Sequence, residues 1–188
     1  MTPTDVLSRL GRVSCVINPL SGSTPEGAAD LIREKLSGLP DDPRIHVAGE
    51  GDLPLLVEQA LADEPDTLIA WGGDGTIACA LSHAGMTGPA VLPLPGGTMN
   101  MLPTRALGGD HDWETLVEAA LRGGRVRPMP CGEIIGGPRF FVAAMLGDMT
   151  RFTNSREALR EGKLLEAAEI VHDSTALALK SNLEWSAP

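Results

Sequence analysis

The first 124 residues alternate between two patterns of hydrophobic and polar positions. Short apolar runs bounded by turn residues are typical of buried strands, and they cover 13–17, 44–48, 67–71 and 90–94. Apolar residues at helical spacing follow each run, over 25–36, 54–62, 76–83 and 99–107. Thr24 followed by Pro25 predicts the start of the first of these helices. Strands that alternate with helices favour a mostly parallel sheet with right-handed crossovers.

The pattern changes near residue 124. Before it, a helix with one apolar stripe is capped by Asp112 and ends at Gly123 and Gly124. After it, the sequence predicts a hairpin with strands 125–135 and 139–146, a charged helix over 154–165, and a second strand pair over 168–172 and 175–183. We therefore predict two parts: a three-layer, Rossmann-like α/β domain at 1–124, and the start of an incomplete antiparallel β domain at 125–188. Unprotected strand edges in the second part favour truncation and self-association into homo-oligomers.

Composition excludes several classes of protein. The chain has 188 residues, of which 43% are hydrophobic, and a net charge of −10. Such a chain builds a real core, and its charge opposes binding to nucleic acid. Its three cysteines are far apart, with neither disulfide nor zinc spacing, which indicates a reduced, cytoplasmic location. The longest apolar run, 140–146, is too short to cross a membrane, and we predict no signal peptide.

The segment Gly72-Gly73-Asp74-Gly75-Thr76 lies between a predicted strand and a predicted helix. Paired glycines allow a sharp turn with exposed N–H groups, and the following helix directs its positive end to the same place. This favours a phosphate site in which Thr76 donates to a phosphate oxygen, while Asp74 holds Mg²⁺ or orients a reacting hydroxyl. An ordinary turn with Asp74 or Thr76 as helix N-cap explains the same residues. We expect Asp74 to be an exposed carboxylate that contributes little to packing.

Two other polar loops follow predicted strands. Asn18-Pro19-Leu20-Ser21-Gly22 comes after the first strand, and Gly96-Gly97-Thr98-Met99-Asn100 after the fourth. All loops that follow parallel strands emerge at the carboxyl edge of the sheet, where ligands bind. The first of these two loops alone is also explained by ordinary turn dipeptides. Their convergence with Gly72–Thr76 predicts one ligand site.

The ordered set Asn18-Pro19-x-Ser21-Gly22, Gly72–Thr76 and Gly97-Thr98-x-Asn100 resembles the catalytic domain of the diacylglycerol kinase and lipid kinase family, over about residues 11–150. The resemblance implies an enzyme that binds ATP and Mg²⁺ at these loops and transfers the γ-phosphoryl group to a lipid alcohol, such as diacylglycerol, at a membrane surface. It implies that Asn18, Ser21 and Gly22 touch the phosphates, that Gly72–Thr76 wrap them, and that Gly97, Thr98 and Asn100 bind the nucleotide. Asp74 is then the catalytic and metal-binding acid.

The sequence also departs from that family. Many members carry Asp directly after the Asn of the third loop, where this chain has Met101, and an Arg that is common close by stands here at Arg105. The family's Asp-Gly-x-Leu-Asp motif has no counterpart, since Glu161-Gly162-Lys163-Leu164-Leu165 only superficially resembles it. A nucleotide-binding pseudokinase or interaction module without turnover is therefore the alternative. An NAD kinase is disfavoured, because no Asn-Glu pair follows the glycine motif.

Overall fold

A computed structural model describes residues 10–49, 52–134, 137 and 139–142. The chain divides into two compact units, residues 1–142 and 143–188. Everything described below belongs to the first unit. The helix predicted over 154–165, the strands predicted over 168–172 and 175–183, and the end of the strand predicted over 139–146 lie outside the described residues.

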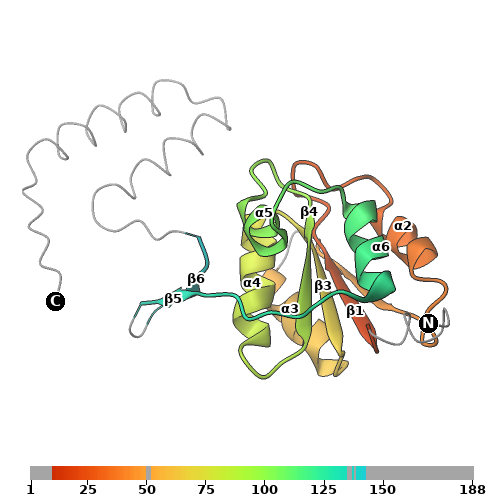
Figure 1. Ribbon diagram of the computed structural model, residues 1–188, viewed down its shortest axis with the longest axis horizontal. Helices are drawn as coiled ribbons and strands as arrows, with labels where there is room; N and C mark the ends of the chain where they lie inside the picture. The colour runs from red at the N-terminus through yellow and green to blue at the C-terminus, as the bar shows by residue number, and fades with distance from the viewer. Residues whose placement is uncertain (1–9, 50–51, 135–136, 138, 143–188) are drawn as a thin grey trace, which may run out of the picture. The chain divides into compact units, whose positions relative to one another are not determined.

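Four parallel strands form the central sheet in the order β2-β1-β3-β4 (Figure 1). They are β1 (Val13–Ile17), β2 (Arg44–Val47), β3 (Thr67–Gly72) and β4 (Ala90–Pro95). Every residue of β1 and β3 is buried, as expected for central strands covered on both faces. β4 carries Pro93 and Pro95, which have no N–H to donate, and it lies at an edge where that donor is not needed.

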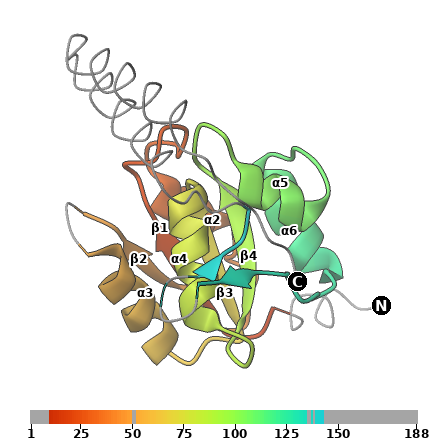
Figure 2. The ribbon, with the colours of Figure 1, turned by 90° about the vertical axis from the view of Figure 1, so that its left-hand side faces the viewer.

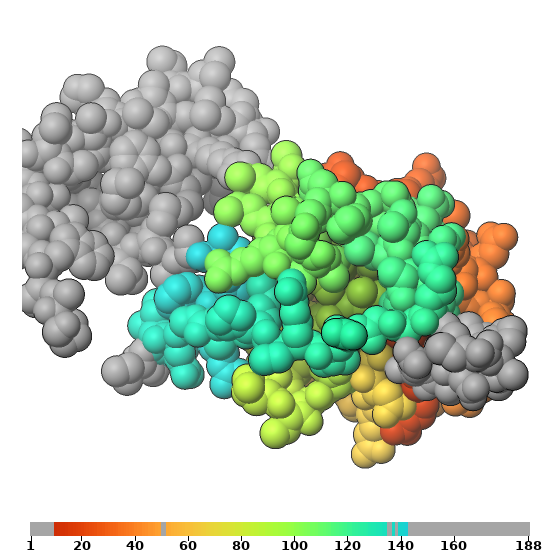
Figure 3. All heavy atoms as spheres, in the orientation of Figure 1, coloured from red at the N-terminus to blue at the C-terminus, as the bar shows by residue number. Residues whose placement is uncertain are grey.

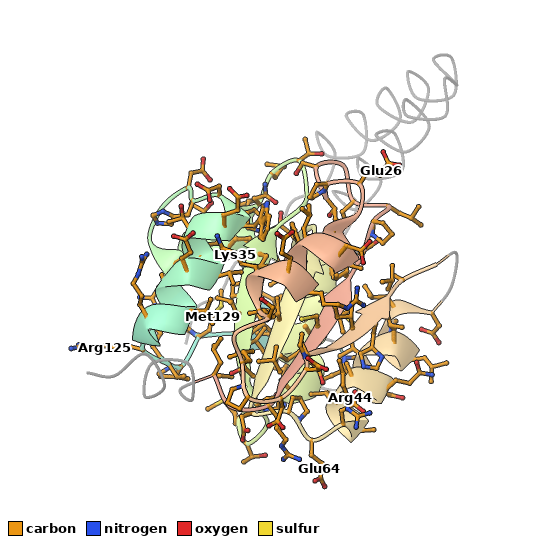
Figure 4. All side chains as sticks on the ribbon, turned by 90° about the vertical axis from the view of Figure 1, so that its right-hand side faces the viewer. Glu26, Lys35, Arg44, Glu64, Arg125 and Met129 are labelled. Carbon is orange, nitrogen blue, oxygen red and sulfur yellow. The ribbon has the colours of Figure 1, made fainter. Side chains whose placement is uncertain are left out.

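Helices cover both faces of the sheet, so the predicted three-layer α/β fold is confirmed. Within the described residues, the helices are α2 (Ala28–Lys35), α3 (Leu53–Ala62), α4 (Asp74–Ala84), α5 (Met101–Leu107) and α6 (Trp113–Gly123). α2 and α6 pack with Ile17, Ile69 and Trp71 in one core cluster. α3, α4 and α5 pack with the opposite side chains of β1 and β3 in another. The Lys35 ammonium of α2 (labelled in Figure 4) binds the Glu118 carboxylate of α6 at 2.5 Å.

The first helix begins later than Thr24 and Pro25 predict. α2 starts at Ala28, after Gly27 in the left-handed region with φ +71°. The Thr24 hydroxyl does not cap a helix, because it donates to the Gly96 carbonyl at 3.4 Å. The β1–α2 loop is consequently longer than expected and reaches across to the loop after β4.

The prediction of a strand over 125–135 is largely wrong. Only Gly132–Glu133 (β5) pairs in antiparallel fashion with Arg139–Phe140 (β6), which confirms the hairpin but not its length. Residues 124–131 run instead across one side of the α/β unit (Figure 3). Tertiary contacts hold this segment: the Arg127 guanidinium donates to the Arg105 and Ala106 carbonyls at the end of α5, and Met129 packs on the α3–α4 cluster.

Over the part of the chain that the structure describes, no helix has the length and apolar character needed to cross a bilayer.

Candidate functional site

Three loops meet at the carboxyl edge of the sheet, and we call residues 18–24, 72–76 and 95–101 the rim. β1 and β3 are neighbours there, while β2 and β4 lie on opposite outer sides, so the crevice between β1 and β3 is the topological switch point where such sheets bind ligands. Backbone hydrogen bonds join the loops: the Ser23 N–H donates to the Gly96 carbonyl, and the Gly96 N–H to the Gly72 carbonyl, both at 2.9 Å. The predicted convergence of the three loops is thus present in the fold.

Two polar side chains of the β1–α2 loop hold the start of α4. Asn18 Nδ2 donates to Thr76 Oγ1 at 3.1 Å, and Ser21 Oγ accepts from the Gly73 N–H at 3.0 Å. Thr76 is only 3% exposed. The Thr76 hydroxyl is therefore buried beneath the rim, where it accepts the hydrogen bond that positions Asn18. The sequence alone did not indicate this contact.

Close approach of neighbouring atoms explains three glycines of the rim. A Cβ on Gly97 would lie 2.7 Å from the Gly73 Cα, and a Cβ on Gly72 would lie 2.6 Å from Thr76 Oγ1. Gly96, which lies in the third predicted loop but is not among the expected nucleotide-binding residues, is equally confined, because a Cβ there would lie 2.9 Å from the Gly72 Cα. Gly73 itself has φ −77° and would meet no atom closer than 3.6 Å. The strict need for glycine therefore falls on the residues around Gly73.

Asp74 does more for the fold than an exposed loop carboxylate would. It is half-buried, and its Oδ1 accepts from the Leu102 N–H at 2.7 Å. Asn100 precedes α5 with φ +47°, and its Oδ1 accepts from the Gly97 N–H at 2.8 Å. The first turns of α4 and α5 are thus tied to each other. The expectation that Asp74 contributes little to packing is wrong, because the carboxylate caps α5 rather than its own helix.

The N-terminus of α4 has backbone N–H groups without a partner among the described residues. Gly73 is its N-cap and offers no side-chain acceptor. Among the described residues, no acceptor takes the N–H groups of Asp74, Gly75 or Thr76. Gly75 is exposed and has open space where a Cβ would stand. Free N–H groups at the positive end of a helix bind phosphate.

The rim lacks a complete metal centre. No group of three or more His, Cys, Asp or Glu side chains within the described part of the chain is arranged to hold a metal ion. Asp74 Oδ2 accepts no hydrogen bond from a described residue and is the carboxylate oxygen left for a cation. Mg²⁺ commonly takes only one or two carboxylates and completes its shell with phosphate and water. The donor set therefore fits Mg²⁺ carried on phosphates but not a free ion.

A thiol–imidazole pair on α4 does not form a nucleophile. Cys79 Sγ lies 3.7 Å from His83 Nδ1, and the same ring nitrogen bonds the Cys79 carbonyl at 2.8 Å. Burial raises the pKa of the Cys79 thiol, and the Asp52 and Glu58 carboxylates raise it further. A thiol with a raised pKa stays protonated and is a weak nucleophile. Acyl transfer through Cys79 is therefore not supported.

A pocket of about 410 Å³ adjoins the rim. Ser23, Pro95 and Asn100 line it on the rim side, and Asp110–Trp113 line it opposite. The Trp113 ring packs on Trp71, with ring centroids 4.6 Å apart. A ligand held at the rim has room to extend there, which the sequence patterns did not reveal.

Comparison with known proteins gives a match to one family and two solved structures that resemble part of the chain. The family model for the diacylglycerol kinase catalytic domain matches residues 12–134, which include all three rim loops. Two structures from Bacillus anthracis str. Sterne, one described provisionally as a diacylglycerol kinase and the other as diacylglycerol kinases, are 24% and 23% identical to the chain, each with a TM-score of 0.49. Each alignment covers 60% of this chain, and 42% and 40% of the other chains. The chain thus spans about two fifths of the length of these proteins.

Proposed function

Because the chain belongs to the diacylglycerol kinase catalytic domain family, we propose that its rim binds ATP and that the protein transfers the γ-phosphoryl group to a lipid alcohol such as diacylglycerol. The observation that carries this proposal is the open N-terminus of α4, where unpaired N–H groups face a crevice that Asn18 and Ser21 hold in place. Backbone donors and a helix dipole bind phosphate without a lysine. The rim contains neither Lys nor Arg.

The proposed roles follow from where each residue lies. Backbone N–H groups of 74–76 surround the phosphates, while the Gly73 N–H stays bonded to Ser21 Oγ. Asn18, Ser21 and Gly22 form the loop beside them. Gly97, Thr98 and Asn100 present the neighbouring loop, which packs on Gly73. Thr76 positions Asn18 instead of donating to a phosphate, because its hydroxyl is buried.

Asp74 is the proposed metal-binding and catalytic acid. Its Oδ2 would hold Mg²⁺ bound to the ATP phosphates, and such an ion would supply positive charge that stabilises the transferring phosphoryl group. Phosphoryl transfer also needs a group that accepts or orients the hydroxyl proton. Asp74 is the one acid among the rim residues, and its Oδ1 is already bonded to Leu102. We therefore expect transfer to need a further group besides the rim, so that the rim residues alone support ATP binding with little or no lipid phosphorylation.

Calorimetry with the full chain tests nucleotide binding. We expect MgATP to bind and to raise the melting temperature, because a ligand that binds only the folded state stabilises it. NAD serves as the control ligand, since an NAD kinase would bind it. Absence of binding at millimolar MgATP would refute the proposal.

A radiolabelled-ATP assay over several lipid alcohols then separates an enzyme from a binding module. Robust turnover that Asp74→Asn abolishes would show that the described rim suffices for catalysis. Binding without turnover would favour the nucleotide-binding module.

The proposed cellular location is the cytoplasm, at the membrane surface where a lipid alcohol is accessible.

A further inference from the structure

Large apolar side chains stand exposed on the rim beside the proposed phosphate site. Leu20 is 68% exposed, Met99 59% and Met101 44%, and we call these three residues the rim patch. Leu20 belongs to the β1–α2 loop, and the two methionines to the connection from β4 into α5. The two loops touch, because the Ser23 hydroxyl donates to the Gly97 carbonyl at 2.8 Å. Figures 1 and 2 show them side by side at the same end of the sheet.

The backbone holds the rim patch in an exposed position. The Leu20 N–H donates to Asn18 Oδ1 at 3.1 Å. The Leu102 N–H, next to Met101, donates to Asp74 Oδ1. These hydrogen bonds, from backbone N–H groups to side-chain oxygens, fix the backbone positions from which the apolar side chains extend into solvent. Their exposure is therefore built into the same contacts that form the rim.

Exposed apolar residues continue along this edge of the sheet. Val47, the last residue of β2, is 48% exposed, and Leu55, in the first turn of α3, is 52% exposed. Both lie at the carboxyl end of the parallel strands, as the rim does. The opposite edge carries Met86, which is 83% exposed just after α4 and offers a matched site for comparison.

Charge on this edge opposes an anionic partner. The rim holds Asp74 and no Lys or Arg, Glu26 lies on the loop before α2 (Figure 4), and the whole chain carries −10. Adhesion through basic residues, the usual means of binding anionic lipid, is therefore absent from the rim. Leucine and methionine instead favour the apolar boundary of a bilayer, and methionine adapts its shape to irregular surroundings.

We propose that the rim patch inserts into the interfacial layer of a lipid bilayer and that this contact is apolar rather than electrostatic. The inference rests on the proposed function, in which the acceptor hydroxyl belongs to a lipid. Such a hydroxyl lies at headgroup level, and a rim inserted there brings the N-terminus of α4 to the same level. Neutral, zwitterionic membranes are the expected partner.

Vesicle flotation with the full chain tests this surface without nucleotide. We expect the chain to float with phosphatidylcholine vesicles, and we expect phosphatidylserine to bring no gain in binding. Each methylene removed from the contact is worth roughly a fourfold change in partition, so Leu20→Ser with Met99→Ser should weaken binding by about tenfold or more. Met86→Ser, which makes the same kind of change at the opposite edge, should leave binding unchanged.

A gain-of-function variant guards against loss of fold. Met99→Trp should strengthen vesicle binding several-fold, because tryptophan favours the membrane interface. Melting curves and MgATP calorimetry on every variant show whether the fold and the nucleotide site remain. Vesicle binding without MgATP binding would refute the proposed function but support the membrane-binding rim patch. MgATP binding without vesicle binding would support the nucleotide site but refute the rim patch as a membrane surface.

Four outcomes would overturn the inference. These are no flotation of the wild-type chain, equal flotation of the rim variant, binding only to anionic vesicles, and a wild-type dimer that the rim substitutions convert to a monomer. The first is expected if another part of the chain covers the rim patch, and the last if a second copy does.

Discussion

Replacement of Asp74 by Asn or by Ala separates the two roles of this carboxylate. Asp74 Oδ1 accepts the Leu102 N–H at 2.7 Å, and Leu102 is 2% exposed. Asparagine keeps an acceptor in the same place but loses the charge that would hold Mg²⁺. Alanine loses both, and it leaves a donor in the first turn of α5 without its partner.

The magnitudes of the two effects differ. Loss of a cap or of the acceptor for a poorly solvated N–H costs about 1–2 kcal/mol. For a chain of this size that lowers the melting temperature by roughly 2–8 °C. Asp74→Asn should cost less than about 1 kcal/mol, since the bond survives without its charge. Both substitutions should remove the dependence of ATP affinity on Mg²⁺.

Two measurements decide between these roles. Thermal unfolding followed by circular dichroism reports the cap, and calorimetry of ATP with Mg²⁺ or with a chelator reports the metal. Equal destabilisation by Asn and Ala would show that the charge, not the acceptor, stabilises α5. An unchanged melting temperature in Asp74→Ala would refute the capping contact, and Mg²⁺-dependent affinity in both variants would refute the metal role.

Three further predictions concern the packing of the rim, the thiols and the capped helix. Gly97→Ala should lower stability by about 1–3 kcal/mol and weaken MgATP binding, because a Cβ on Gly97 would lie 2.7 Å from the Gly73 Cα. Gly73→Ala should fold normally, and equal melting curves for the two variants would contradict this reasoning. Burial raises the pKa of Cys15 to about 12, so a thiol reagent should modify exposed Cys131 in the native chain and Cys15 only after unfolding. Hydrogen bonds from Thr115 lower the pKa of Asp112. The Asp112 carboxylate therefore stabilises the fold above its unfolded pKa, and this stabilisation is lost as pH falls below about 4. The melting temperatures of wild type and Asp112→Ala should converge between about pH 6 and pH 2.

Local patterns were sufficient for most elements of the α/β unit. β1 is buried at every residue and matches the predicted run 13–17, and Asp112 caps α6 through the Thr115 N–H at 2.7 Å as predicted. These features depend on residues close together in the chain, so propensity and periodicity describe them. The loops of the rim were found for the same reason, because a parallel sheet brings every loop that follows a strand to one edge.

The errors came from contacts between distant segments. Thr24 bonds Gly96 instead of capping a helix. Asp74, expected to be an exposed carboxylate, caps α5. Arg127 bonds the end of α5 where a strand was predicted. Local patterns do not record these partners, because only folding brings them close.

The order of strands and helices along the chain, the acidic charge and the three loops with candidate chemistry are all read from local patterns. Three features needed the packed fold: which glycines are confined, which oxygen of Asp74 is already bonded, and the place of Leu20 and Met99 beside the N-terminus of α4. The physical reason is that periodicity records which face of an element is buried, whereas the partner of a loop side chain depends on distances set by the packed sheet.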